Sequence, residues 1–149
     1  LSIKNLEWYQ HYYLSYKIFL GMPIIGSGIK TFRIYCPKIR EKNYVTKNYS
    51  CSTHPHHAYL EVLAEGGIFG LTILLYFLFK IFFQFVQIYI YNPKSRIEIL
   101  PIFIFFLVNI QPFQIMGSFF SSYAGFFYFF SIGVSLVFVQ QYANSKNLK

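Results

Sequence analysis

An apolar stretch of 24 residues, 68–91, constrains what this chain can fold into more than any other feature. It is interrupted by one charge, Lys80, and by two glutamines. A helix needs about 20 predominantly apolar residues to cross the hydrocarbon core of a bilayer. The stretch therefore predicts a membrane-spanning helix.

Charged residues are distributed unevenly along the chain. Of the 149 residues, 12% are charged and 55% are hydrophobic, whereas about a quarter of a soluble domain is charged. Twelve charged residues precede Ile68 and only six follow it. The part of the chain before Ile68 is thus polar and basic, and the part after it is apolar. This composition argues against a soluble fold, a disordered chain, a disulfide-rich scaffold and a collagen-like fibre.

Two more apolar segments follow the first one. Residues 97–112 form a shorter segment that ends at a proline, and residues 119–140 form a third. A short charged turn over 92–96 separates the first two. We therefore predict an all-α integral membrane protein. Its C-terminal transmembrane region, 58–149, has about three helices, over roughly 68–91, 97–112 and 119–140.

Residues 1–20 predict a helix at the membrane surface. Apolar side chains recur with roughly helical spacing at Leu6, Tyr9, Tyr13 and Tyr16. Trp and Tyr are enriched at membrane–water interfaces, so we expect this helix to lie on the bilayer or to emerge from it. An amphipathic helix that covers a protein core is the alternative.

Residues 21–57 predict a long basic loop. Three glycines and a proline near its start indicate turns, and basic residues far outnumber acidic ones. Loops of this length are usually functional or disordered. Cys36 and Cys51 lie 15 residues apart in this loop. They can pair in an oxidising compartment, or both can remain free.

The cations of this loop predict an anionic partner. The guanidinium groups of Arg33 and Arg40 match phosphate oxygens in a bidentate manner, and Lys30 adds positive charge. Beside a bilayer, the partner is either anionic headgroups or a lipid-linked diphosphate. Nucleic acid fits poorly, because the loop is tied to membrane helices.

Three histidines, His54, His56 and His57, lie within four positions at the end of the loop. A histidine is suited to taking a proton from a hydroxyl at neutral pH. Their spacing is not a known zinc pattern. A metal-binding module that also uses Cys51, and a polar helix cap, are the alternatives. Ser52 and the proline three residues later are typical of a helix start, which predicts a helix from His56.

His57, Glu61 and Glu65 are spaced four residues apart and share one face of that helix. A carboxylate there can orient an imidazole and raise its basicity, and the alternative is a solvated face near the headgroups. The chain contains no Asp, so a Mg²⁺ site built from aspartates is not expected. We expect no cofactor.

Residues 54–70 carry a resemblance to a known family. They read HPHHAYLEVLAEGGIFG and lead directly into the first apolar stretch. This segment resembles the motif of the O-antigen ligase and O-antigen polymerase superfamily of bacterial envelopes: a histidine, then Asn, Ser or Gln, nine variable residues and Gly-x-x-Gly. His56 takes the place of the histidine, and Gly67 and Gly70 take those of the glycines. His57 departs from the usual Asn.

Two other segments are similar to the same family. Residues 23–32, PIIGSGIKTF, resemble the stretch that opens the family's large periplasmic loop. Residues 112–125 resemble the short periplasmic turn before its last helix. The three segments lie between residues 23 and 125, so the region over which the resemblance extends is most of the chain.

The resemblance implies a metal-independent membrane glycosyltransferase. A glycan on undecaprenyl diphosphate would be the donor, and its acceptor would be a sugar hydroxyl on lipid A core or on another lipid-linked glycan. His56 would be the catalytic base. Arg33, Arg40 and Lys30 would neutralise the leaving diphosphate. The remaining motif residues would have positioning roles: His54, His57, Glu61, Gly67 and Gly70.

The resemblance also implies a location in the bacterial inner membrane, with loop 21–57 in the periplasm. Family members have about a dozen spans, and the chain begins with Leu1 rather than Met. We therefore expect a C-terminal fragment whose partners include the N-terminal helices of a longer parent chain. The alternative is a non-enzymatic membrane protein, part of a polysaccharide-export or transport system, whose basic loop only binds lipid headgroups.

Overall fold

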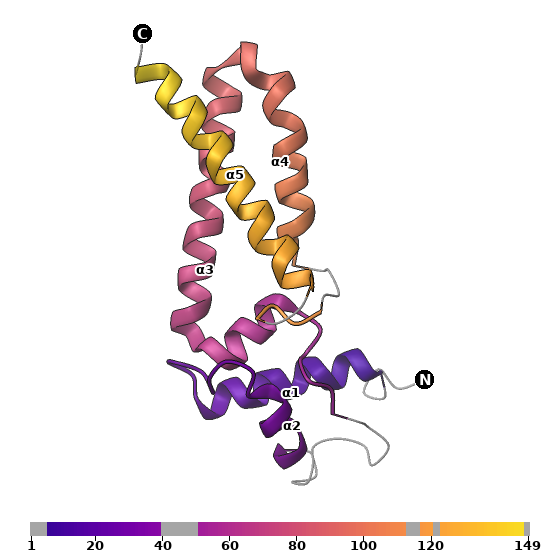
Figure 1. The fold of residues 1–149 in the computed structure, drawn as a ribbon. Coiled ribbons are helices and arrows are strands. Elements are labelled where there is room, and N and C mark those ends of the chain that lie inside the picture. The colour runs from indigo at the N-terminus through magenta and orange to yellow at the C-terminus, as the bar shows by residue number, and fades with distance from the viewer. Residues whose placement is uncertain (1–5, 40–50, 113–116, 121–122, 148–149) are drawn as a thin grey trace. The chain divides into compact units, whose positions relative to one another are not determined.

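A computed structural model describes residues 6–39, 51–112, 117–120 and 123–147, with side chains as far as Tyr142. Its helices are α1 (Glu7–Gly21), α2 (Phe32–Ile39), α3 (Ala58–Tyr91), the short 3₁₀ helix η3 (Pro93–Ser95), α4 (Arg96–Ile110) and α5 (Tyr123–Asn147) (Figure 1). These described ranges contain no strand, so the predicted all-α class is confirmed for them.

Two of the described helices, α3 and α5, are long and apolar enough to cross a membrane. They have 34 and 25 residues. The helix between them, α4, has 15 residues, or about 22 Å of helix, and is shorter than the ~20 residues that a span needs. The span predicted over 97–112 therefore corresponds to α4, which is too short to cross a bilayer as a straight helix. The span predicted over 119–140 corresponds to α5, which begins at Tyr123.

The chain divides into two compact units. The first consists of residues 1–73 and 112–125, and the second of residues 74–111 and 126–149. All described residues that the sequence singles out for chemistry belong to the first unit. In the second unit, the buried ring of Phe85 packs against Phe103 and Phe106, with ring centroids 5.1 and 5.7 Å apart.

The face that α1 buries differs from the one that the spacing of Leu6, Tyr9, Tyr13 and Tyr16 predicts. Leu6, Tyr9 and Tyr16 are exposed. The buried residues are instead Gln10, His11, Leu14, Ser15 and Ile18. Three of these are polar, so an argument from apolar spacing does not find this face. The helix itself is present as predicted, with an aromatic exposed face.

A short helix, α2, lies in the segment for which the sequence predicts only a loop. Its buried residues, Phe32 and Cys36, form a core with Leu14 and Ile18 of α1 and with Ala64 of α3. This core lies within the first unit and depends on contacts between segments far apart in the sequence. Tertiary packing therefore stabilises α2, whose eight residues are too few for an independent helix.

Candidate functional site

The 23–28 segment fills a break in α3. At Gly67 the backbone leaves the helical region, with φ 66° and ψ −167°. This break removes the helical bonds from Ile68 and Phe69 to the carbonyls four residues earlier. Ile68 N–H donates instead to the Pro23 carbonyl at 2.8 Å, and Phe69 N–H donates to the Ile24 carbonyl at 3.1 Å.

The carbonyls that lose their helical hydrogen-bond donors at the break accept hydrogen bonds from the same segment. Ser27 N–H donates to the Ala64 carbonyl at 3.0 Å, and Gly28 N–H donates to the Glu65 carbonyl at 2.9 Å. Four backbone groups orphaned inside α3 thus find four partners in residues 23–28, as buried backbone groups require. Residues 23–28 and the break in α3 are therefore joined by four backbone hydrogen bonds, and we call this junction the backbone clamp.

Glycines are required at the closest approach of the clamp. Gly26 and Gly67 both have positive φ, 72° and 66°. A Cβ on Gly26 would collide with the Glu65 carbonyl, and one on Gly67 would collide with the Ile24 carbonyl. Gly70 is different, because a Cβ there would meet only Val62 at ordinary distances of 3.8 and 3.9 Å. Of the two motif glycines, Gly67 is the one that the geometry demands.

Glu65 closes the clamp with its side chain. It is 2% exposed, and its two carboxylate oxygens accept hydrogen bonds from the backbone N–H groups of Lys30 at 2.7 Å and Phe32 at 2.9 Å. Phe32 is the first residue of α2, where free N–H groups favour a negative charge. Glu65 therefore caps α2, which explains why a helix forms in the predicted loop.

Glu61 holds a different segment. It is 1% exposed, and its carboxylate accepts hydrogen bonds from the Ser118 hydroxyl at 2.6 Å and the Phe119 N–H at 2.7 Å. The expectation that a carboxylate on this face orients the His57 imidazole is therefore wrong for Glu61, and so is the alternative of a solvated face. Both glutamates instead connect α3 to distant backbone.

His57 caps the N-terminus of α3. The helix begins at Ala58, two residues later than predicted, and the Leu60 N–H donates to His57 Nδ1 at 3.3 Å. Asn commonly fills such a capping position, and here the His57 ring supplies the acceptor. Accepting this bond requires a neutral ring. Burial lowers the pKa of His57, while hydrogen bonds to the carbonyls of His57 and Pro112 act in the opposite direction.

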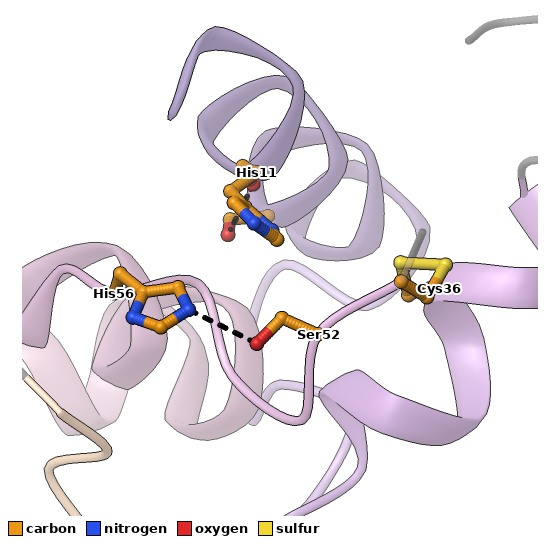
Figure 2. Close-up of a disulfide and its surroundings, with 6 residues drawn as sticks. His11, Cys36, Ser52 and His56 are labelled. Carbon is orange, nitrogen blue, oxygen red and sulfur yellow. Dashed lines mark hydrogen bonds between the residues drawn. A yellow bond between two sulfur atoms is a disulfide. The ribbon is translucent and has the colours of Figure 1, made fainter. Parts of the chain in front are cut away.

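His56 has a left-handed backbone conformation, with φ 58°. Such a conformation is uncommon for a residue other than Gly, although His and Asn adopt it more readily than most. The side chain is half-buried, and its Nε2 is hydrogen-bonded to the Ser52 hydroxyl at 3.0 Å (Figure 2). The sharp turn and the Ser52 bond together fix where the imidazole lies.

Aromatic and imidazole rings surround His56. The ring of His54 lies 4.1 Å from it, that of His11 5.2 Å and that of Trp8 5.5 Å, measured between centroids. Figure 2 shows His11 reaching from α1 towards the Ser52–His56 pair. Burial, followed by the nearby charges of His56 and His54, lowers the pKa of His11 to about 4. Burial and His56 also lower the pKa of His54.

A disulfide closes the loop beside this cluster. Cys36 of α2 is bonded to Cys51, and their Cα atoms are 5.9 Å apart. The bond attaches α2 to the 51–57 segment that carries Ser52 and His56 (Figure 2). Of the two possibilities that the sequence leaves open, the structure therefore has the paired one.

The predicted phosphate-binding cations have different positions. Lys30 and Arg33 are both exposed, at the turn that leads into α2 and in its first turn. Lys30 has a positive φ of 62°, and Arg33 is near enough to Glu65 for its charge to act on that carboxyl. Arg40 lies outside the described residues.

Sequence reasoning missed His11, Trp8 and the pairing of Ser52 with His56. His11 lies more than 40 positions away from His56, and no short motif connects them. One signal was available in the polar residues Gln10, His11 and Ser15, because their helical spacing marks one side of α1. Reading that side as buried requires knowing what packs against it.

Over the ranges with described side chains, no group of three or more His, Cys, Asp or Glu residues is placed to hold a metal ion. Comparisons of the chain with protein-family models, with curated proteins and with solved structures found no match.

Proposed function

We propose that this protein is a membrane-bound glycan transferase of the O-antigen ligase and polymerase type. It transfers a glycan from undecaprenyl diphosphate to a sugar hydroxyl. The observation that carries the proposal is the backbone clamp, because the two separate segments that resemble this family form one structure around Gly26 and Gly67. His56, the motif histidine, lies two residues before the start of the helix that this clamp holds.

His56 acts as the base in this proposal. It takes the proton of the acceptor hydroxyl while the hydroxyl oxygen bonds to the anomeric carbon and the bond from that carbon to the diphosphate oxygen breaks. The hydrogen bond to Ser52 and the packing against Trp8 favour one orientation of the ring. General-base help of this kind contributes about 10²–10⁴ in rate.

Lys30 and Arg33 neutralise the leaving diphosphate, together with Arg40. Both described cations are exposed and thus open to a ligand, and the guanidinium of Arg33 can pair with two phosphate oxygens at once. Positive charge that is already in place where negative charge develops is usually a large contribution to catalysis.

Two features support the proposed cellular location. α3 and α5 have the length and hydropathy of membrane spans, so we place the protein in a membrane, with the bacterial inner membrane as the site of lipid-linked glycan chemistry. Disulfides persist mainly in oxidising compartments. The Cys36–Cys51 bond therefore supports a periplasmic location for residues 21–57.

A His56→Asn variant tests the proposal. Asn tolerates the left-handed conformation of residue 56 but cannot act as a base, so the fold is expected to persist. Transfer of a radiolabelled glycan from its undecaprenyl diphosphate carrier is measured in membranes that contain the intact protein, with His54→Asn as the matched control. We expect His56→Asn to lower the rate by about 10²–10⁴ and His54→Asn to lower it far less. Wild-type transfer by His56→Asn would refute the assignment.

A further inference from the structure

Three exposed isoleucines lie in the clamp segment 23–28 or directly after it, where backbone hydrogen bonds hold the turn. Ile24, Ile25 and Ile29 are 69%, 74% and 64% exposed. Between them, Gly26 N–H donates to Met22, while Ser27 and Gly28 donate to carbonyls of α3. We call these three side chains the isoleucine tip. Exposed apolar side chains on a fixed turn suggest a binding surface.

The isoleucine tip adjoins the start of the apolar run of α3. The carbonyls of Pro23 and Ile24 accept the N–H groups of Ile68 and Phe69, and the side chains of Ile68 and Phe69 are themselves 50% and 64% exposed. Residue 68 is where the 24-residue apolar stretch begins. If α3 crosses a bilayer, the tip lies at the level where hydrocarbon meets headgroups.

The charges next to the isoleucine tip match the headgroup layer of an anionic membrane. Lys30 follows Ile29 directly, and Arg33 lies three residues later, both exposed. Residues 22–39 contain no Asp or Glu, and the nearby Glu65 carboxylate is buried against backbone N–H groups. Exposed apolar side chains with basic side chains next to them are typical of a segment that is anchored in the membrane interface.

We propose that the isoleucine tip inserts into the lipid bilayer and that Lys30 and Arg33 hold phosphate groups at its surface, those of anionic headgroups or the diphosphate of a lipid-linked donor. The clamp then fixes the site at a defined depth relative to the membrane surface. This inference rests on the proposed membrane crossing of α3 and not on the transfer reaction. The occupant is lipid, because the tip is continuous with the apolar run that lipid is expected to cover.

Tryptophan fluorescence in nanodiscs tests this placement. The chain has one Trp, so Trp8→Phe provides a background into which single reporters are placed. Ile25→Trp reports on the tip, with Ile24→Trp as a second tip reporter. Phe79→Trp, about 16 Å along α3 from Ile68, reports on the span. Thr53→Trp is the matched exposed control, because it lies in a polar segment without exposed large apolar residues.

Lipids brominated near the headgroup should quench both tip reporters, lipids brominated deep in the chain should quench Phe79→Trp, and neither should quench Thr53→Trp. Quenching of Phe79→Trp without quenching of either tip reporter would overturn the insertion and leave the membrane crossing intact. A lack of quenching at all positions would overturn both. Blue-shifted tip emission without lipid quenching would show that protein covers the tip, and would also overturn the inference.

A second arm tests the charge preference. In mixed nanodiscs, brominated phosphatidylglycerol should quench Ile25→Trp more strongly than the same fraction of brominated phosphatidylcholine. Each cation near an anionic surface contributes about fivefold to lipid preference, so Lys30→Gln and Arg33→Gln should each lower the preference by up to about that factor. Equal quenching by the two lipids in the wild-type background would refute the headgroup assignment.

Discussion

Replacement of Gly67 by alanine is the sharpest structural test of the backbone clamp. At φ 66° and ψ −167°, this residue occupies a region that is essentially restricted to glycine, where another residue costs about 1–3 kcal/mol. A Cβ would also collide with the Ile24 carbonyl. Gly67→Ala should therefore weaken docking of the 23–28 segment by at least about 1–3 kcal/mol, or roughly 5–150-fold in the population of the undocked segment.

Native-state hydrogen exchange measures this effect directly, because exchange reports local opening free energies. The amides of Ser27 and Gly28 donate to α3 carbonyls, so a peptide covering residues 22–31 should exchange roughly 5–150 times faster in Gly67→Ala than in wild type. Gly70→Ala is the matched control, since its Cβ makes only ordinary contacts with Val62. Unchanged exchange in Gly67→Ala, or equal acceleration in Gly70→Ala, would refute the reasoning.

Three further predictions concern the same unit. Glu61→Gln replaces one of two acceptor oxygens that hold Ser118 and Phe119, so the midpoint of thermal unfolding should fall by an amount corresponding to about 1–3 kcal/mol; an unchanged midpoint would contradict this role. Reduction of the Cys36–Cys51 bond should cost about 3 kcal/mol, measured by unfolding with and without dithiothreitol; equal stability would be inconsistent with a loop-closing role. Unfolded His11 takes up a proton near pH 6.5 and folded His11 only near pH 4. The unfolded state therefore binds more protons in this window, and the free energy of unfolding should fall as pH is lowered from 6.5 to 4. His11→Gln should show a shallower slope, and an identical slope would exclude His11 as the source.

Local sequence patterns predicted the helices that depend on local properties. The apolar stretch over 68–91 became the main part of α3, because length and hydropathy are sufficient to indicate such a helix. The helical spacing of apolar residues in 1–20 likewise predicted a helix where α1 lies, although not the face that it buries. The late start of α3 differs from prediction because His57, rather than Ser52, supplies the cap.

The features that the sequence did not reveal depend on long-range contacts. α2 is stabilised because Glu65, more than 30 residues away, accepts hydrogen bonds from the N–H of its first residue, Phe32, and from that of Lys30 just before it. His11 joins the histidine cluster because α1 buries a partly polar face. No periodicity within a short window contains such information, since the partner of each residue is set by the fold as a whole.

Chemical rescue of a His56→Gly variant tests the central claim most directly. Glycine adopts φ 58° without steric cost, so the backbone at residue 56 is kept while the imidazole is removed. Glycan transfer by membranes containing the intact protein is then measured with and without added imidazole, and His54→Gly is the control. The account predicts a loss of about 10²–10⁴ in rate and partial restoration by imidazole for His56→Gly alone. Transfer at the wild-type rate by His56→Gly without imidazole would contradict the role of His56 as the base.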